Sequence, residues 1–148
     1  TLTVELAAVK VTSAMLNRLG VKVRGDERDP DLVNAAFRAL ASGGERLRWE
    51  PFFFDWFCAK EARAMAGPRA DLYGQEAFAD FRRLLAQAEP ERPERLQADY
   101  FARPEPEELL YDEIEAIWAP IDERDDWSAF EAKLDAIETA RQAWDLRD

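Results

Sequence analysis

Apolar residues recur at helical spacing along most of the chain. Between residues 2 and 19 they form two rows, the first being Leu2, Leu6, Val9 and Leu16 and the second Val4, Ala8, Val11, Met15 and Leu19. Positions three, four and seven apart lie on one side of a helix, so this spacing predicts a helix that ends at Gly20. Two apolar rows also predict broad burial of that helix.

A second helix is predicted to begin at Asp29-Pro30. Asp29 can cap free amide groups, and Pro30 at the first helical position lacks the N–H that would go unbonded there. The predicted helix ends at Gly43-Gly44, whose permissive backbone is typical of a helix stop. Its apolar face comprises Leu32, Val33, Ala36, Phe37 and Leu40.

Residues 49–57 hold six of the 17 aromatic side chains of the protein, which has 9 Phe, 5 Trp and 3 Tyr. Large rings bury roughly 150–250 Å² each, so we expect this run to dominate the core. A helix is predicted over residues 51–66, starting at Pro51. The alternative is a short strand over residues 52–57, because Phe and Trp favour strands and a short apolar run has no diagnostic period.

A further helix is predicted over residues 75–88, and a proline-rich connector follows it. Residues 89–106 contain Pro90, Pro93, Pro104 and Pro106 among charged residues. Proline removes amide donors and fixes φ, so this segment is expected to be an extended linker on the surface. Its large apolar residues, Leu96, Tyr100 and Phe101, are expected to hold it in place.

Two acidic amphipathic helices are predicted after the connector. The first runs from Glu107 to Ala119, where Pro120 interrupts it, and the second begins near residues 125–128, where Ser128 and Glu131 have capping-box spacing. Their apolar rows are Leu110, Ile114, Ile117 and Ile121 in the first, and Phe130, Leu134, Ile137 and Trp144 in the second.

These elements predict an all-α protein, an irregular bundle of about six helices with a proline-rich connector. Residues 1–88 are expected to form a helical core with the aromatic cluster, residues 89–106 the connector, and residues 107–148 an acidic two-helix segment packed on that core. One domain is expected overall. Because the sequence begins at Thr1, we expect it to be part of a longer polypeptide.

The charge of the protein is concentrated in its last third. Of the net charge of −11, all falls in residues 105–148, which hold 15 acidic and 4 basic residues. Such a surface repels phosphate groups, so nucleic acid and anionic membranes are not expected as partners, whereas a basic protein surface is. The simpler interpretation is a solvated helical face. A single cysteine makes no internal disulfide, which favours a cytoplasmic location.

Candidate catalytic groups are few. The sequence has no histidine, and Cys58 directly follows the aromatic run, which favours a buried structural thiol. Carboxylates are the remaining candidates for a cation site. Glu108, Asp112 and Glu115 are predicted to share one side of a helix, and Asp122, Glu123, Asp125 and Asp126 fall in one loop. That loop lacks EF-hand spacing, so metal binding is the least favoured hypothesis.

Several short motifs resemble the C-terminal region of the selenoprotein O family. They are Leu16-Asn-Arg-Leu-Gly-Val21, Arg24-Gly-Asp-Glu-Arg-Asp29, Asp31-Leu-Val-Asn-Ala-Ala-Phe37 with Leu40, and Phe52-Phe-Phe-Asp-Trp56. Pro93-Glu-Arg-Leu96, Tyr100-Phe-Ala-Arg-Pro104 and the stretch from Asp112 to Phe130 resemble the tail of one bacterial branch of that family. The matches are short and span nearly the whole chain.

The resemblance implies a kinase-like protein that transfers AMP from ATP to hydroxyl side chains of other proteins, uses Mg²⁺ or Mn²⁺ and is linked to redox homeostasis. In that family the nucleotide- and metal-binding residues precede the region matched here, so no catalytic, cofactor-binding or metal-binding residue is assigned in this chain. The kinase-like domain is then the expected partner. The alternative is a free-standing acidic helical module that binds a basic protein.

Two departures from the family pattern are visible. Many members end in a cysteine or selenocysteine motif, whereas this chain ends Trp144-Asp-Leu-Arg-Asp148, which puts a redox role of this segment in doubt. Members also commonly follow the Phe-Asp-Trp stretch with a glycine-rich turn. Here Phe57-Cys-Ala-Lys60 follows, so the helix is expected to continue.

Overall fold

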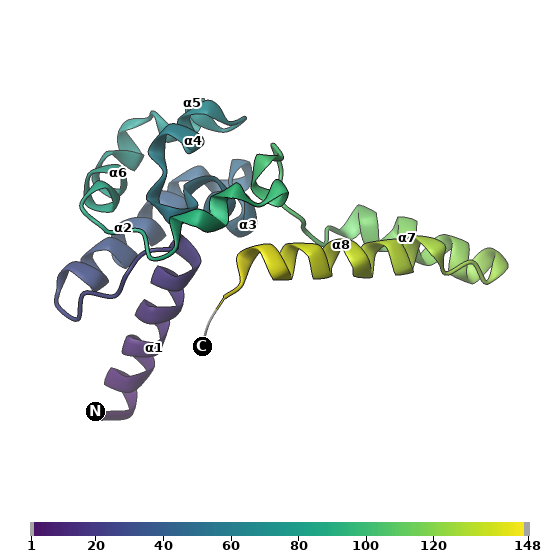
Figure 1. Cartoon of the computed structure of the whole chain (residues 1–148), viewed down its shortest axis with the longest axis horizontal. Coiled ribbons are helices and arrows are strands. Elements are labelled where there is room, and N and C mark those ends of the chain that lie inside the picture. The colour runs from purple at the N-terminus through teal and green to yellow at the C-terminus, as the bar shows by residue number, and fades with distance from the viewer. Residues whose placement is uncertain (1, 147–148) are drawn as a thin grey trace.

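The computed structural model describes residues 2–146, which fold into helices joined by short turns (Figure 1). The α-helices are α1 (Leu2–Leu19), α2 (Arg28–Gly43), α3 (Trp49–Trp56), α4 (Glu61–Ala66), α5 (Ala70–Tyr73), α6 (Ala79–Ala86), α7 (Tyr111–Arg124) and α8 (Ser128–Trp144). The 3₁₀ turns are η1 (Gly44–Arg46), η2 (Phe57–Ala59), η3 (Glu76–Phe78), η4 (Pro93–Gln97) and η5 (Asp99–Ala102). These residues contain no strand, so the predicted all-α irregular bundle is confirmed.

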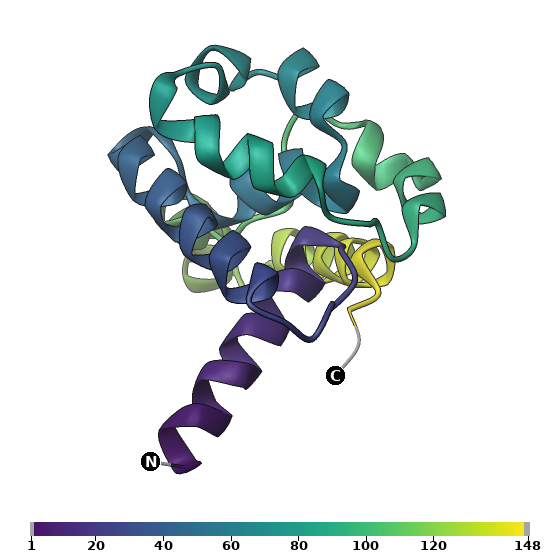
Figure 2. The same ribbon diagram turned by 90° about the vertical axis from the view of Figure 1, so that its left-hand side faces the viewer.

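The helices are distributed unevenly in space. Helices α2 to α6 gather into one compact group, while α7 and α8 run side by side away from it as a hairpin (Figure 1). The first turns of α1 also extend clear of the other helices, as the second view shows (Figure 2). The protein therefore has a core and two projections.

Helix α3 lies at the centre of the core. Phe52, Phe53, Phe54 and Trp56 are each at most 2% exposed. The ring of Trp56 contacts those of Tyr73 and Phe81 at centroid distances of 5.1 and 5.2 Å, and Phe54 contacts the ring of Phe101 at 5.7 Å. The helical form of this run rules out the alternative of a strand over residues 52–57.

The predicted continuous helix over residues 51–66 is wrong in its middle. Helix α3 ends at Trp56, and α4 begins only at Glu61. Cys58 and Ala59 between them adopt φ values of 60° and 55°, which L-residues with a Cβ atom rarely adopt. The end of α1 packs against this turn, since a Cβ added to Gly20 would lie 2.8 Å from the Cys58 nitrogen. Helical periodicity carries no signal for such a turn.

Asp29 has a different role from the predicted helix cap. Helix α2 begins at Arg28, so Asp29 lies within its first turn, and the side chain is buried at 4% exposure. Its carboxylate accepts hydrogen bonds from the backbone N–H groups of Arg24 (3.0 Å) and Gly25 (2.8 Å). Asp29 thus fixes the preceding loop, and Asp26 instead accepts a hydrogen bond from the backbone N–H of Arg28, the first residue of α2, at 2.9 Å.

The proline-rich segment 89–106 is more ordered than an extended linker. It forms the turns η4 and η5, and Tyr100 and Phe101 are each 4% exposed, so both belong to the core. Leu96 packs against the core from its edge. The three apolar side chains named in the sequence therefore hold the segment, as predicted, but they do so from within 3₁₀ turns.

The bounds of the two acidic helices differ from the prediction. Helix α7 starts at Tyr111, four residues later than expected, and continues through Pro120 to Arg124. Helix α8 is capped by Asp126, whose Oδ1 accepts hydrogen bonds from the backbone N–H (3.0 Å) and the hydroxyl (2.7 Å) of Ser128. The capping box expected from Ser128 and Glu131 is therefore replaced by an aspartate cap.

The hairpin is attached to the core through the end of α8. Trp144 is 5% exposed and its ring lies 4.7 Å from that of Phe57. Arg95 donates to the backbone carbonyl of Trp144, and Arg92 Nη2 donates to the carbonyl of Asp145 at 2.6 Å. Cations at a helix C-terminus stabilise its unpaired carbonyl groups and favour its dipole. The predicted packing of this segment on the core is thus limited to the root of the hairpin.

Candidate interaction surfaces

Cys58 is enclosed by the aromatic core. Its side chain is 2% exposed, and burial raises the pKa of the thiol to about 11. The thiolate is the nucleophilic form of cysteine, and a thiol with this pKa stays protonated at neutral pH. The structure thus presents Cys58 as an unreactive core residue.

The carboxylates expected to share one side of a helix are separated. Glu108 precedes α7 and forms a two-pronged ion pair with Arg48, with distances of 2.7 and 3.0 Å to its oxygens, whereas Asp112 and Glu115 lie within the helix. The shared side was predicted from a helix that began at Glu107. Because α7 begins at Tyr111, that prediction is wrong for Glu108, whereas Asp112 and Glu115 lie three positions apart on α7.

Of the four acids expected in one loop, Asp122 and Glu123 lie within α7, and only Asp125 and Asp126 form the turn at the tip of the hairpin. Asp125 takes a left-handed conformation at φ 53° and accepts a hydrogen bond from the indole N–H of Trp127 at 2.8 Å. Asp126 caps α8, and Arg124 lies 3.6 Å from carboxylates of both Glu123 and Asp126. Among residues 2–146, no group of three or more potential metal ligands comes together.

The first turns of α1 expose both of their apolar rows. Val4 and Val11 from one row are 67% and 51% exposed, and Leu6 and Val9 from the other are 55% and 62% exposed. The prediction of broad burial holds only for the last turns, where Met15, Leu16 and Leu19 enter the core. A helix that is apolar on two sides is normally covered on both. The start of α1 is therefore a candidate contact surface.

The α7–α8 hairpin carries the second exposed apolar surface. No residue of α7 is buried, and on α8 only Ala140 and Trp144 are. Between the helices lies an open groove of about 290 Å³. Its lining consists of apolar side chains and the stem of one lysine, namely Leu109, Ile114, Ile117, Trp118, Ile121, Trp127, Phe130, Lys133, Leu134 and Ile137. We call this surface the hairpin groove.

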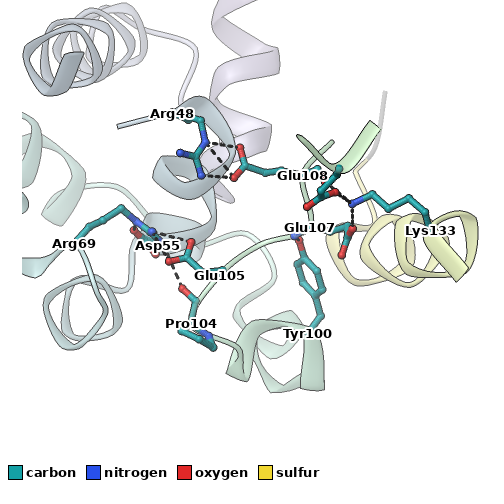
Figure 3. A network of polar contacts seen from close by, with 10 residues as sticks. Arg48, Asp55, Arg69, Tyr100, Pro104, Glu105, Glu107, Glu108 and Lys133 are labelled. Carbon is teal, nitrogen blue, oxygen red and sulfur yellow. Dashed lines mark hydrogen bonds and ion pairs between the residues drawn. The ribbon is translucent and has the colours of Figure 1, made fainter. Parts of the chain in front are cut away.

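Ion pairs hold the segment that leads into the hairpin against the core (Figure 3). Arg48 binds Glu108, and Arg69 binds Glu105 with two contacts of 2.9 Å. Arg69 also pairs with the buried Asp55 at 2.5 and 2.9 Å, and the hydroxyl of Tyr73 donates to the same carboxylate at 2.5 Å. Burial and the neighbouring Asp55 raise the pKa of Tyr73, so its hydroxyl remains a donor.

A second set of polar contacts joins the same segment to α8 (Figure 3). The Lys133 ammonium, with its side chain 13% exposed, donates to the carboxylates of Glu107 and Glu113 and to the backbone carbonyl of Glu108. Burial lowers the pKa of Lys133, but the two carboxylates outweigh it and the net shift is upward. Tyr100 Oη accepts a hydrogen bond from the Glu107 backbone N–H at 2.8 Å. These contacts set the direction in which the hairpin leaves the core.

A larger hollow of about 620 Å³ lies where the end of α8 meets α1 and α3. Arg18 lies on its wall, 4.4 Å from the Trp144 ring centroid and 2.7 Å from Glu50. Glu107 and Glu108 also line the hollow and bind Lys133 and Arg48, respectively. These charged groups of the hollow are thus already paired with each other or with neighbouring residues. This pairing favours a structural role for the hollow, at the junction of the hairpin with the core, over a ligand-binding role.

Comparisons of the chain with protein-family models, with curated proteins and with solved structures give no match. The resemblance to the selenoprotein O family therefore stays a prediction. Within residues 2–146, none of the helices is both long and apolar enough to cross a membrane.

The sequence predicts the apolar rows of the two exposed surfaces but not their exposure. The apolar rows of α1, α7 and α8 were identified from their spacing, but spacing does not tell whether another element covers a row. The clue for the hairpin groove was the excess of acidic residues beside those rows. Charged residues beside an apolar row indicate that solvent borders it. The ion pair of Lys133 with Glu107 cannot be predicted from local sequence spacing, because 26 positions separate the two residues.

Proposed function

We propose that this chain is the helical C-terminal region of a selenoprotein O-like protein adenylyltransferase, and that it packs against the kinase-like domain of that protein. The observation that carries the proposal is the exposure of both apolar rows on the first turns of α1. A surface of this kind in a stable protein is normally covered by another folded part.

The free energy available from such contact is substantial. Complete burial of a Val or Leu side chain stabilises by about 1.5–3 kcal/mol, and Val4, Leu6, Val9 and Val11 are each more than half exposed. Because these four side chains point to both sides of the helix, a partner that covers them must form a cleft or contribute two elements. An adjoining domain of the same protein meets this requirement without the loss of translational freedom that binding in trans entails.

The positions that carry the resemblance also support the proposal. Leu16, Leu19 and Phe52 are fully buried, so the motifs coincide with residues on which the core depends. After the Phe-Asp-Trp stretch, Cys58 and Ala59 adopt positive φ values. Glycine adopts such values without strain, and members of the family commonly carry a glycine-rich turn at this point.

In this proposal the transfer of AMP takes place elsewhere in the protein. ATP and the divalent metal ion are bound by the kinase-like domain, and no residue of the present chain is assigned to either. The contribution of this region is to bury apolar surface of the catalytic domain and to fix the position of the hairpin relative to it.

The test is binding between this chain and the kinase-like region encoded upstream in the same reading frame, measured by calorimetry with separately purified parts. The double variant Val4→Asp/Val9→Asp places one charge in each apolar row and is expected to weaken binding by at least about tenfold, because each buried charge without a partner costs more than 1.4 kcal/mol. Val23→Asp is the matched control, since Val23 is 58% exposed and lies outside α1.

Two results contradict the proposal. One is a reading frame with no kinase-like region before this chain. The other is AMP transfer to a protein substrate by this chain alone, followed with radiolabelled ATP and Mg²⁺ or Mn²⁺.

A further inference from the structure

The hairpin groove has the dimensions of a helix-binding site. On this side its lining runs from Trp127, directly before α8, to Ile137 on that helix, which at 1.5 Å per residue is about 15 Å, or three helical turns. The floor is apolar, and Trp118, Ile114 and Leu134 on it are 60%, 43% and 49% exposed. Two helices that leave this much apolar surface open lack the third element that normally completes such a layer.

Acidic residues follow the groove residues in a regular pattern. Five residues of the lining are each followed directly by an acid, in the pairs Ile114-Glu115, Ile121-Asp122, Phe130-Glu131, Leu134-Asp135 and Ile137-Glu138. One position along a helix is a rotation of about 100°, so these acids lie to one side of the apolar floor.

The contact line between α7 and α8, here called the seam, shows on which side of the floor these acids lie. Glu113 directly precedes Ile114, Lys133 directly precedes Leu134, and these two charged side chains form an ion pair between α7 and α8. Residues one position before the groove residues therefore face the seam. The acids one position after them lie on the outer edges, and all five are exposed.

Most of these edge acids have no cation of their own. Within the part of the chain that the structure describes, Glu138 pairs with Arg141 at 2.6 Å, whereas Glu115, Asp122, Glu131 and Asp135 form no ion pair. Both outer edges of the apolar groove thus carry unpaired negative charge.

We propose that the hairpin groove binds an amphipathic helix of another protein, about three turns long, with an apolar face and Lys or Arg residues on both flanks. The apolar face covers the groove floor, and the flanking cations meet the two acidic edges. A second copy of the hairpin is a poor occupant because it brings acids against acids, and nucleic acids and anionic membranes are repelled by the same edges. The inference is independent of the proposed function, because a different surface carries it.

The test uses a synthetic 18-residue peptide with leucines at helical spacing and lysines on both flanks, labelled with fluorescein and titrated with the whole 148-residue chain. A second peptide has the same leucines with glutamate in place of every lysine. Anisotropy is expected to show saturable binding of the lysine peptide at least tenfold tighter than that of the glutamate peptide. Raising the salt concentration weakens the lysine complex, because exposed charges are screened.

Variants of the chain locate the site. Glu115→Lys/Glu131→Lys reverses one charge on each outer edge and is expected to weaken the lysine peptide about tenfold, since each exposed pair contributes up to about 1 kcal/mol and reversal adds repulsion. Glu45→Lys/Glu76→Lys is the matched control, because both acids are exposed, form no ion pair with another described residue and lie in the core region. Circular dichroism verifies that each variant remains helical.

Four results overturn the proposal: equal affinity for the two peptides, no saturable binding of the lysine peptide, equal weakening by the edge and control variants, and a dimer in sedimentation that the edge variant strengthens. The last result assigns the groove to a second copy of the chain. Loss of lysine-peptide binding only in the α1 variant Val4→Asp/Val9→Asp also contradicts the groove proposal. The proposed function is tested separately, by binding of the same variant to the kinase-like region.

Discussion

The core around α3 and the α7–α8 hairpin are built from similar apolar residues but bury them to different extents. Trp56 and Phe52 in the core are fully buried, whereas Trp118 and Ile114 in the hairpin are 60% and 43% exposed. The difference lies in the number of elements around each. Helix α3 is surrounded by elements on several sides, while α7 has α8 as its main neighbour. Apolar content alone therefore does not tell whether a helix is a core element or a binding surface.

Truncation of one tryptophan in each region gives the largest contrast. Trp56→Ala is expected to lower the free energy of unfolding by about 3–5 kcal/mol, because it leaves a cavity among packed rings. Trp118→Ala removes an exposed ring and is expected to cost less than about 1 kcal/mol. Guanidinium denaturation followed by circular dichroism measures both. Similar costs for the two variants would show that the hairpin is covered in solution.

A second contrast concerns ion pairs. Asp55→Asn removes the buried negative charge that pairs with Arg69 and leaves one acceptor oxygen for Arg69 and Tyr73 where the carboxylate has two, and is expected to cost about 3 kcal/mol or more. Asp71→Asn makes the same change in an exposed pair with Arg46, where both side chains are more than 60% exposed, and is expected to cost under 1 kcal/mol. The same denaturation experiment applies. A stability of Asp55→Asn equal to that of Asp71→Asn would mean that solvent reaches Asp55.

The buried thiol of Cys58 predicts that the free energy of unfolding depends on pH. Burial raises the pKa of Cys58 from 9.0 to about 11, so the folded protein holds the thiol proton more tightly than the unfolded chain does. The associated stability is complete below pH 9 and is lost as the pH rises from about 9 through about 11, by on the order of 2 kcal/mol. Urea denaturation of the native protein and of Cys58→Ala at pH 7.5 and 10.5 isolates this effect. Identical pH slopes for the two proteins would exclude it.

Within the hairpin, substitution of Lys133 is expected to lower the free energy of unfolding. Lys133→Met keeps the apolar stem but removes the ammonium that joins Glu107, Glu113 and the Glu108 carbonyl. The expected loss is about 1–2 kcal/mol, because hydrogen bonds to charged groups contribute on this scale. Amide hydrogen exchange is expected to accelerate in α7 and to stay unchanged in α2. Equal acceleration in both helices would show that the two regions unfold as one unit.

The smallest expected effect is a gain in stability. Ala59 has a φ of 55°, a conformation in which glycine avoids the strain of a Cβ atom. Ala59→Gly is therefore expected to raise the free energy of unfolding by up to about 1 kcal/mol, offset in part by the greater freedom of glycine in the unfolded chain. Ala70→Gly within α5 is the control and is expected to destabilise. A loss of stability in Ala59→Gly would place the strain elsewhere.

The sequence predicted the helical class and the central aromatic run because both depend on local composition and spacing. It failed where a distant group decides the local structure. Asp29 was expected to cap its own helix, but it binds Arg24 and Gly25, and helix α7 passes through Pro120 where a stop was predicted. The turn at Cys58 follows from contact with α1, which periodicity does not contain.

The hairpin groove was harder to predict than the fold. Each of its apolar rows was visible by spacing, and so were the acids that follow them. Whether the rows face a third helix or solvent depends on the whole tertiary structure, and the sequence gives no such information for Leu134 or Trp118. The ion pair of Glu113 with Lys133, which fixes which acids lie on the outer edges, depends equally on the fold.

Trp144 fixes the rotational orientation of the hairpin relative to the core. It follows Ile137 by seven positions on one continuous helix, about two turns, so the ring inserted in the core and the residue at the near end of the groove share one face of α8. Removing a single residue between them would swivel the groove by about 100° about the α8 axis while leaving its surface composition intact. Lengthening the far tip at Asp125 would instead extend the reach of the hairpin without turning it.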